Sequence, residues 1–284
     1  MFALIEVIWI LRGRNDSKFV NDWNSQLPKY AGDGKVYHGA YGHRLRQHLE
    51  QLDQLNKVYL TLKHNPPSRQ AVLQIWDSAI DLPDVHGQPK APDIPCNLTA
   101  MLTIRDGKLE WSQVARSNDL IRGVPYNFIQ FTSLQEIIAG WLGVELGKYF
   151  HFANSLHIYE KDIDDFYAEY SENSIPHFNE SLGLPFTESE EVFSNLEQIV
   201  VELTSTQLTL TSIKDLIGKT TLPRSYQNML YIIAAEAARK RKWLEYSNEV
   251  AEYCTNPMLK AVWGNWVSRL SSLKVTLPRK EIIN

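Results

Sequence analysis

Cysteine is scarce in this sequence, which has only two among its 284 residues, Cys96 and Cys254. Two cysteines cannot build a disulfide framework, and they cannot supply the ligands of a four-cysteine zinc site. A chain without disulfide bridges is typical of a reducing compartment, so we expect a cytoplasmic protein. The sequence offers no candidate metal ligands.

A strong excess of charge of one sign is also missing. The chain has 29 basic and 33 acidic residues, which gives a formal net charge of −4. A charge balance of this kind produces no global field that would recruit nucleic acid or an anionic membrane. We therefore expect neither nucleic acid nor a membrane among the partners.

The third absence is a hydrophobic run long enough to cross a membrane. The apolar stretch 1–11 has about half of the ~20 residues that a spanning helix needs, and Glu6 interrupts it. No basic stretch precedes this run, and Arg12 and Arg14 follow it, which does not fit a secretory signal. There is also no internal repeat and no low-complexity segment.

What the sequence does contain is an ordinary globular balance, with 44% hydrophobic and 22% charged residues. Its pattern changes near residue 160. Before that point, strand and helix patterns alternate with turn signals, and Asp106-Gly107 predicts a tight hairpin turn. The expected strands are 71–76, 97–104, 109–114 and 149–159, and the expected helix is 132–146. Residues 1–163 are therefore predicted to form an α+β domain.

The second part of the chain, 164–284, is predicted to be mostly helical. Thr187 and Glu190 have the spacing of a capping box ahead of apolar residues with helical periodicity. Further helices are expected over 225–246 and 257–273. The predicted fold class is thus α+β, a sheet-and-helix core followed by a helical extension.

Glu6 is an unusual residue because its neighbours Ile5, Val7 and Ile8 are apolar. Burial in a core helix would raise the pKa of this carboxyl group and prepare it to donate or relay a proton. A position at the edge of an amphipathic helix face is an equally compatible interpretation.

Cys96 stands at the entrance of a predicted strand. A lone cysteine is more often an inert small hydrophobe than a nucleophile, but other residues accompany this one. Arg116, if it lay nearby, would lower the pKa of the thiol. Asn127 offers an acceptor and two donors, enough to read a carbonyl group and an adjacent ring N–H. His157 and Tyr159, two residues apart on a predicted strand, point to one face.

This ordered set resembles the thymidylate synthase family, which includes the pyrimidine hydroxymethylases. The resemblance covers about residues 1–163. Its main motifs are Pro-Cys at 95–96, Arg-Ser-x-Asp at 116–119, Gly-x-Pro-aromatic-Asn at 123–127 and His-x-Tyr at 157–159. Supporting matches are Glu-x-x-Trp-x-Leu-x-Gly from Glu6, Tyr41-Gly42 and Ser68-Arg69. The set is specific for the fold and less specific for the reaction.

The resemblance implies a folate-dependent transferase acting on C5 of a pyrimidine nucleotide of the dUMP or UMP type. The thiolate of Cys96 would add to C6, so that C5 captures the one-carbon unit of 5,10-methylenetetrahydrofolate. Glu6 would organise water and proton transfer, and Tyr41 would belong to the network that removes the C5 proton. Asn127 would read the O4 and N3 edge. Cytosine-specific relatives resemble this pattern with Asp at that position, so Asn127 favours a uracil base.

Further residues are implied to bind the nucleotide. Arg116 and Ser117 would hold its phosphate, together with Arg69 from the second subunit of a homodimer. His157 and Tyr159 would hold a sugar hydroxyl group, which both ribose and deoxyribose offer.

Asp119 and Trp9 are implied to contact the folate, with Asp119 at its pterin ring.

The chain departs from the family pattern in three places. The N-terminal segment with a phosphate-binding arginine loop would precede Met1, and Gln70 replaces the second residue of an Arg-Arg pair. The tail that closes over the folate is not matched by residues 276–284.

These departures leave alternatives at the level of function. The methylene group at C5 can receive hydride from the folate or hydroxide from water, and exclusion of water selects the methyl product. Methylation, the commoner outcome in the family, and hydroxymethylation are both compatible with the sequence. The alternative to an enzyme is a non-catalytic nucleotide-binding or assembly protein, with residues 164–284 as a helical partner-binding module.

Overall fold

The computed structural model describes residues 1–163, 178 and 180–276, with the backbone alone over 271–276. The comparison of residues 276–284 with the family's tail therefore concerns a segment that lies almost wholly outside the described part. The described residues form two compact units. One consists of residues 2–163 and 181–204, and the other of residues 205–276 with 1, 178 and 180.

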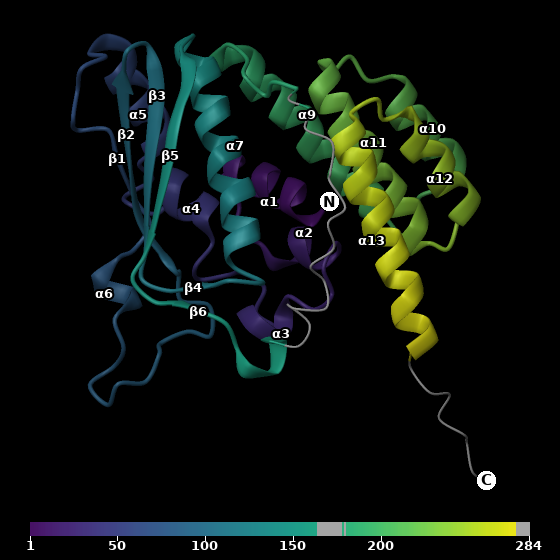
Figure 1. The fold of residues 1–284 in the computed structure, drawn as a ribbon, viewed down its shortest axis with the longest axis horizontal. Helices are drawn as coiled ribbons and strands as arrows, with labels where there is room; N and C mark the ends of the chain where they lie inside the picture. Colours follow the sequence, from purple (N-terminus) through teal and green to yellow (C-terminus); the bar gives the residue numbers. More distant parts are fainter. Residues whose placement is uncertain (164–177, 179, 277–284) are drawn as a thin grey trace. The chain divides into compact units, whose positions relative to one another are not determined.

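A four-stranded sheet forms the framework of the first unit, in the order β1-β2-β3-β5 (Figure 1). Its strands are β1 (Val72–Gln74), β2 (Asn97–Arg105), β3 (Lys108–Ala115) and β5 (Glu145–Ala153). The first three strands are antiparallel, and β5 runs parallel to β3. A separate two-stranded sheet pairs β4 (Asn118–Asp119) with β6 (Leu156–His157). Together with the helices, these sheets confirm the predicted α+β class.

Helices cover one face of the four-stranded sheet. Helix α5 (Gln54–His64) packs on β1 and β2, and α7 (Val124–Leu142) packs on β3 and β5. Because strand side chains alternate between the two faces, Leu73, Leu102 and Trp111 are buried under these helices. The hydrophobic core of the unit lies in this layer.

Helix α1 (Phe2–Leu11) belongs to the same core and contacts α4 (Tyr41–Arg46), α7 and α9 (Phe186–Thr204). Most of its side chains are apolar and buried, as in a helix surrounded by protein. The short helices of the unit are α2 (Ser17–Asn21), α3 (Pro28–Ala31), α6 (Ser78–Asp81) and the 3-10 helix η1 (Glu160–Asp162). Among the described helices, none combines the length and the hydrophobicity that a membrane crossing requires.

The hairpin between β2 and β3 has the predicted turn. Asp106 and Gly107 both adopt the left-handed conformation, with φ of 49° and 74°. A two-residue turn of this kind matches the right-handed twist of its strands. The predicted strands 97–104 and 109–114 are confirmed, whereas β1 is shorter than the predicted 71–76.

The prediction of a helix over 132–146 is wrong at both ends. Helix α7 begins eight residues earlier, with Pro125 in its first turn, and ends before Gly143, whose φ is 66°. A left-handed glycine ends a helix, so the following residues are free to enter β5. The predicted strand 149–159 is also wrong in extent, because β5 ends at Ala153 and β6 is a separate strand.

Helix α9 belongs to the first unit although it lies beyond residue 163. Glu197 accepts hydrogen bonds from Arg12 Nε at 2.8 Å and from Arg14 Nη1 at 2.5 Å. Glu190 pairs with Arg46 of α4 at 3.1 Å. These ion pairs hold α9 against the end of α1. Thr187 lies inside the first turn of α9, so the prediction that it caps the helix is wrong.

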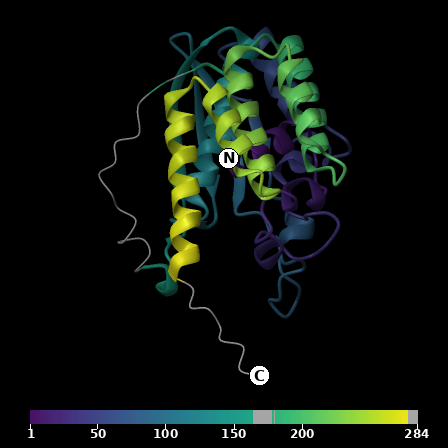
Figure 2. The ribbon, with the colours of Figure 1, turned by 90° about the vertical axis from the view of Figure 1, so that its right-hand side faces the viewer.

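The second unit is helical, and its members pack against one another (Figure 2). They are α10 (Leu210–Gly218), α11 (Arg224–Lys240), α12 (Leu244–Tyr253) and α13 (Pro257–Thr276). The predicted helix 225–246 is wrong, because α11 and α12 are separate. Lys242, with φ of 64°, breaks the helix between them. The predicted helix 257–273 corresponds to α13.

Candidate active site

The catalytic residues predicted from the sequence come from different elements of the first unit. Glu6 is in α1, Tyr41 begins α4, Cys96 directly precedes β2, and Asn127 is in the first turn of α7. Tyr41 interacts electrostatically with both Cys96 and Glu6. Asn97 hydrogen-bonds both Tyr41 and Asn127. The fold thus gathers these four side chains into one cluster.

Arg116 holds the loop that presents Cys96. Its Nε donates to the Pro95 carbonyl at 3.0 Å, and its Nη2 donates to the Ile94 carbonyl at 3.1 Å. Its backbone N–H donates to the Cys96 carbonyl at 2.8 Å. The guanidinium group also lies over the ring of Trp76, 5.8 Å from its centroid. Arg116 therefore fixes the nucleophile loop while its charge stays beside the thiol.

Burial governs the ionisation of Cys96. It raises the pKa of the thiol, and the nearby Asp93 carboxylate raises it further, whereas Arg116 acts in the opposite direction. The effect expected of Arg116 is present, but the net pKa is above its ordinary value. The predicted lowering by Arg116 is therefore confirmed, and burial outweighs it in the free protein.

Glu6 is a half-buried residue whose carboxyl oxygen Oε2 is fully buried. Burial raises the pKa of its carboxyl group to about 8, against a smaller lowering by a hydrogen bond from Gln130. Its Oε2 is buried and has no hydrogen-bond partner among the described residues. At neutral pH this carboxyl group therefore holds a proton that it can donate, as the burial interpretation of the sequence predicted.

Asn97, the residue after Cys96, links the cluster. Its Nδ2 donates to Tyr41 Oη at 2.9 Å and to Asn127 Oδ1 at 3.0 Å. Burial raises the pKa of Tyr41 well above its usual range, and the neighbouring Cys96 adds to that rise. Because Tyr41 Oη accepts from Asn97, its own O–H is directed elsewhere.

Asn97, Gln113 and Gln130 are also buried in this cluster, and they were not among the site residues predicted from the sequence. Gln113 Nε2 donates to Asn97 Oδ1 at 3.0 Å, and Asn127 Nδ2 donates to Gln130 Oε1 at 3.3 Å. One signal was available for Gln113. It alternates with the apolar Trp111 and Ala115 along a strand, which marks an amide turned toward the core.

The proposed ligand-binding residues around the second sheet also lie together. Asp119 of β4 is paired in register with His157 of β6. The His157 and Tyr159 rings contact each other edge to face, with centroids 5.2 Å apart. Asp119 Oδ1 accepts the backbone N–H groups of Ile121 and Arg122. Its Oδ2 has no hydrogen bond to a described residue.

The structure shows no hydrogen bond or ion pair between the Cys96 cluster and the side chains of the three remaining predicted residues, Ser117, Trp9 and Arg69, all of which it describes. Ser117 is half-buried, directly after Arg116. Trp9 is buried, and its indole N–H donates to the Asp16 carbonyl at 3.2 Å. Arg69 is exposed in the turn before β1 and makes no hydrogen bond or ion pair with the described residues. The structure does not join Arg69 to the cluster within one chain.

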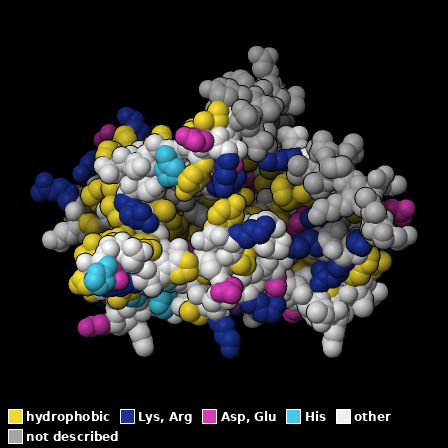
Figure 3. Space-filling model, turned by 90° about the horizontal axis from the view of Figure 1, so that it is seen from below, with side chains coloured by type: hydrophobic (Ala, Val, Ile, Leu, Met, Phe, Trp, Pro, Cys, Tyr) yellow, Lys and Arg dark blue, Asp and Glu magenta, His cyan; other side chains and the backbone are white. Residues whose placement is uncertain are grey.

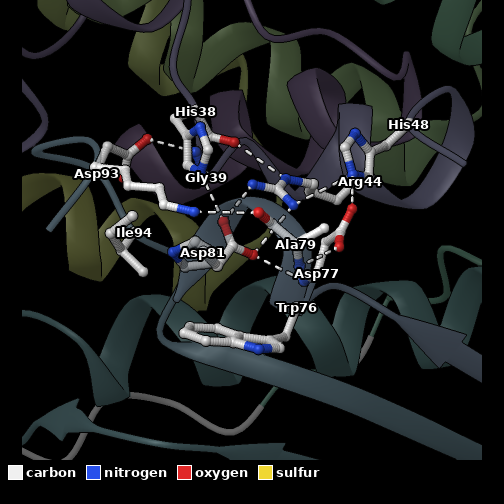
Figure 4. Close-up of polar contacts among 12 residues, drawn as sticks. His38, Gly39, Arg44, His48, Trp76, Asp77, Ala79, Asp81, Asp93 and Ile94 are labelled. Carbon is white, nitrogen blue, oxygen red and sulfur yellow. Dashed lines mark hydrogen bonds and ion pairs between the residues drawn. The ribbon is translucent and has the colours of Figure 1, made fainter. Parts of the chain in front are cut away.

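A second polar network supports α4 and the nucleophile loop (Figure 4). The buried Arg44 donates to both oxygens of Asp81, at 2.8 and 3.2 Å, and His38 Nε2 lies 2.6 Å from Asp81 Oδ1. Gly39 N–H donates to Asp93 Oδ2 at 3.0 Å. A Cβ at Gly39 would lie only 2.8 Å from the Asp93 carbonyl oxygen. The loop before Cys96 is thus packed directly on the chain before α4.

In the part of the chain that the structure describes, no three His, Cys, Asp or Glu side chains are grouped as metal ligands. Figure 3 shows Lys and Arg side chains scattered among acidic, polar and hydrophobic ones on the face seen from below.

Comparison with known proteins agrees with this fold. The family model described as thymidylate synthase matches residues 2–202, more than half of the chain. The protein therefore belongs to the thymidylate synthase family. The match includes α9, which the contacts also place in the first unit.

Curated relatives carry two different names. The chain is 38% identical over 182 residues to the deoxyuridylate hydroxymethyltransferase of Bacillus phage SP01, covering 61% of this chain and 46% of that protein. It is 41% identical over 162 residues to the enzyme of that name from Pseudomonas phage M6, covering 56% and 44%. It is 31% identical to the thymidylate synthase of Clostridium beijerinckii, covering 57% and 58%. The chain thus spans about half the length of these relatives.

Proposed function

We propose that this protein is a folate-dependent enzyme that transfers a one-carbon unit to C5 of a deoxyuridylate-type nucleotide. The observation that carries the proposal is the cluster around Cys96. A half-buried thiol, the guanidinium group of Arg116, the carboxyl group of Glu6 and the amide of Asn127 converge from four parts of the chain. Each of these groups has a role in nucleophilic addition to a uracil ring.

The proposed chemistry gives each of these groups one role. Cys96 Sγ adds to C6 of the ring once its proton is lost, and Arg116 favours the thiolate form. Asn127 orients the O4 and N3 edge. Glu6, protonated at neutral pH, supplies a proton as negative charge develops on the ring. Tyr41 directs its hydroxyl toward the C5 side.

The residues near Asp119 fit a reduced folate, which would supply the one-carbon unit. Pterin rings present N–H donors, and Asp119 Oδ2 is a carboxylate oxygen without a described partner. We propose Asp119 and Trp9 as the folate-binding residues. We further propose that Arg116 and Ser117 hold the phosphate, and that residues 157–159 hold the sugar.

The relatives favour hydroxymethylation over methylation. The two deoxyuridylate hydroxymethyltransferases are 38% and 41% identical to this chain, while the thymidylate synthases are 29–31% identical. We therefore propose 5-hydroxymethyldeoxyuridylate as the product, formed when hydroxide from water adds at the C5 methylene. Thymidylate is the second candidate, because the family match carries that name. Mass spectrometry of the product separates the two, which differ by one oxygen atom.

A homodimer completes the proposal. Across the uncovered face of the sheet, register places Val72, Met101 and Ser112 in line with Phe150, and Phe152 lies in the next row. Val72 is 47%, Met101 42%, Phe150 49% and Phe152 60% exposed. An apolar sheet face of this kind is typical of a protein interface. We propose that a second copy covers it and brings its own Arg69 to the phosphate.

The test is covalent trapping. Incubation with 5-fluoro-deoxyuridylate and methylenetetrahydrofolate is expected to give a mass increase on the intact protein. A base can remove the C5 hydrogen of the normal substrate as a proton but cannot remove fluorine from C5, so the covalent adduct persists. Cys96→Ala is expected to abolish the adduct, while Cys254→Ala, at the buried cysteine of the second unit, keeps it. Nucleotide binding without any adduct would instead support a non-catalytic nucleotide-binding protein.

A further inference from the structure

The buried side chains behind the Cys96 loop form a continuous series of hydrogen bonds. Trp111 Nε1 donates to Gln113 Oε1 at 3.0 Å, and Gln113 Nε2 donates to Asn97 Oδ1 at 3.0 Å. Asn97 Nδ2 donates to Asn127 Oδ1, and Asn127 Nδ2 donates to Gln130 Oε1. We call these five residues the amide relay.

The relay has one direction, which its first member sets. An indole N–H can donate but never accept, so Gln113 must turn its oxygen toward Trp111. Its nitrogen then faces Asn97, which must present an oxygen in return. The same requirement passes to Asn127. Each amide therefore has its oxygen toward Trp111 and its nitrogen toward Gln130.

The other end of the relay is compatible with this direction. Gln130 hydrogen-bonds the carboxyl group of Glu6, which accepts such a bond in either protonation state. A protonated Glu6 can also donate, so this end tolerates both directions. Trp111 is thus the member that imposes the order.

Burial makes the order costly to break. All five relay residues are buried. Reversal of one amide would set oxygen against oxygen on one side and N–H against N–H on the other. Each such buried mismatch costs about 1–3 kcal/mol, since no water replaces the lost bond.

We propose that Trp111, Gln113 and Asn97 are positioning residues that lock the Asn127 amide and thereby decide which pyrimidine it accepts. The inference rests on the proposed function, in which Asn127 reads the base. Uracil presents an acceptor at C4 and a donor at N3, whereas cytosine presents the opposite pair. An amide held in one orientation matches uracil, and the reversed amide matches cytosine.

The first test removes Gln113, the hydrogen-bonded link between Trp111 and Asn97. Gln113→Met keeps the length of the side chain but neither accepts from Trp111 nor donates to Asn97. The affinities for deoxyuridylate and deoxycytidylate are measured by titration calorimetry. The ratio of the two is expected to fall about tenfold or more, which corresponds to about 1.4 kcal/mol. Gln135→Met is the matched control.

Gln135 is a buried glutamine outside the relay, whose Nε2 donates to the Leu109 carbonyl at 2.8 Å. Gln135→Met is expected to lower stability, as Gln113→Met is. The ratio of the affinities for deoxyuridylate and deoxycytidylate is expected to stay at the wild-type value in Gln135→Met. The comparison separates control of specificity from a general loss of packing.

Gln113→Glu tests the direction itself with almost no change of shape. A neutral Glu side chain can still donate to Asn97, but an ionised one only accepts, which forces Asn97 and then Asn127 to reverse. The preference for deoxyuridylate in this variant is expected to fall as pH rises between about 6 and 9, the range in which a buried glutamate ionises. Glu6, Tyr41 and Cys96 face the same cluster in both proteins, so the wild-type pH profile is the reference.

The proposed function and the amide relay are contradicted by different results. A wild-type protein that binds neither nucleotide would overturn the proposed function. A wild-type preference for deoxyuridylate that persists unchanged in both Gln113→Met and Gln113→Glu would overturn the relay and leave the proposed function in place.

Discussion

At the scale of the residue, burial acts on Glu6 and Cys96 in the same sense and with different consequences. It raises the pKa of both groups. The acid thereby keeps a proton to donate, while the thiol loses reactivity that Arg116 only partly restores. In the proposed mechanism, the acid is therefore prepared before the nucleotide binds, whereas the thiol needs a further shift toward its thiolate form.

The raised pKa of Glu6 predicts that the free energy of unfolding falls as pH rises. The pKa of its carboxyl group is about 8 in the folded protein, against an ordinary value of 4.5. Between these values the folded state holds a proton that the unfolded chain releases, so stability is lost as pH rises. The loss amounts to roughly 3 kcal/mol. Glu6→Gln is expected to remove it, as measured by urea unfolding at about pH 5 and about pH 8.

The control for this prediction is Glu191→Gln, at an exposed acid of α9. It is expected to keep the wild-type difference between the two pH values. An unfolding free energy of Glu6→Gln that changes with pH as steeply as the wild type would contradict the account of Glu6.

Substitution of Gly39 is expected to slow formation of the covalent adduct, although Gly39 is not one of the proposed reacting groups. In Gly39→Ala the new methyl carbon would lie 2.8 Å from the Asp93 carbonyl oxygen and 3.1 Å from Pro95 N. The Cys96 loop must therefore shift. We expect at least a tenfold slower covalent adduct with 5-fluoro-deoxyuridylate, about 1.4 kcal/mol in the barrier. Gly264→Ala, where a Cβ meets open space, should leave the rate unchanged.

At the scale of the element, a buried ion pair helps to position α4. Arg44 is buried and bonds both oxygens of Asp81 at the end of α6 (Figure 4). Burial alone would raise the pKa of Asp81, but hydrogen bonds from the Asp77 N–H, Arg44 and His38 bring it below its ordinary value. This ion pair positions the helix that begins with Tyr41.

Asp81→Asn is expected to destabilise the protein by about 3 kcal/mol, because it leaves the Arg44 charge buried without a counter-ion. The measurement is the urea unfolding midpoint. Asp77→Asn is the comparison, since Asp77 pairs only with the partly exposed His48. This substitution is expected to cost at most about 1 kcal/mol, because Asn can still cap α6 and the lost ion pair is partly exposed. Equal losses in the two variants would show that the buried pair has no special role.

Two of the wrongly predicted helix limits share one cause. Helix α7 ends at Gly143 and the helices α11 and α12 separate at Lys242, two positions with positive φ. Hydrophobic periodicity continues across both, so the sequence pattern does not report the break. The backbone reverses there because the following segment has a packing site elsewhere, which periodicity does not describe.

At the scale of the whole molecule, the uncovered sheet face predicts the oligomeric state. Phe152 is the most exposed of its large apolar residues. Phe152→Asp is expected to convert a dimer to a monomer, because it would bury a carboxylate in an apolar interface. Sedimentation velocity provides the measurement. A wild-type protein that is monomeric at micromolar concentration would contradict the proposed dimer.

Arg69 provides a test of a shared active site. If each site takes Arg69 from the second subunit, Arg69→Ala and Cys96→Ala are each inactive alone. Mixed dimers of the two variants would have one site with both residues intact. Activity is therefore expected to return on mixing and subunit exchange. No recovery in mixed dimers would place Arg69 outside the site.

The sequence by itself determined the family and the α+β class and supplied the candidate site residues, because these depend on short motifs and on local periodicity. Cys96, Arg116 and Asn127 were identified by their neighbours along the chain. Only the tertiary structure decided the net pKa of the Cys96 thiol, the inclusion of α9 in the first unit and the order of the amide relay. Desolvation and hydrogen-bond direction depend on residues such as Trp111 and Gln130 that meet only when strands and helices pack.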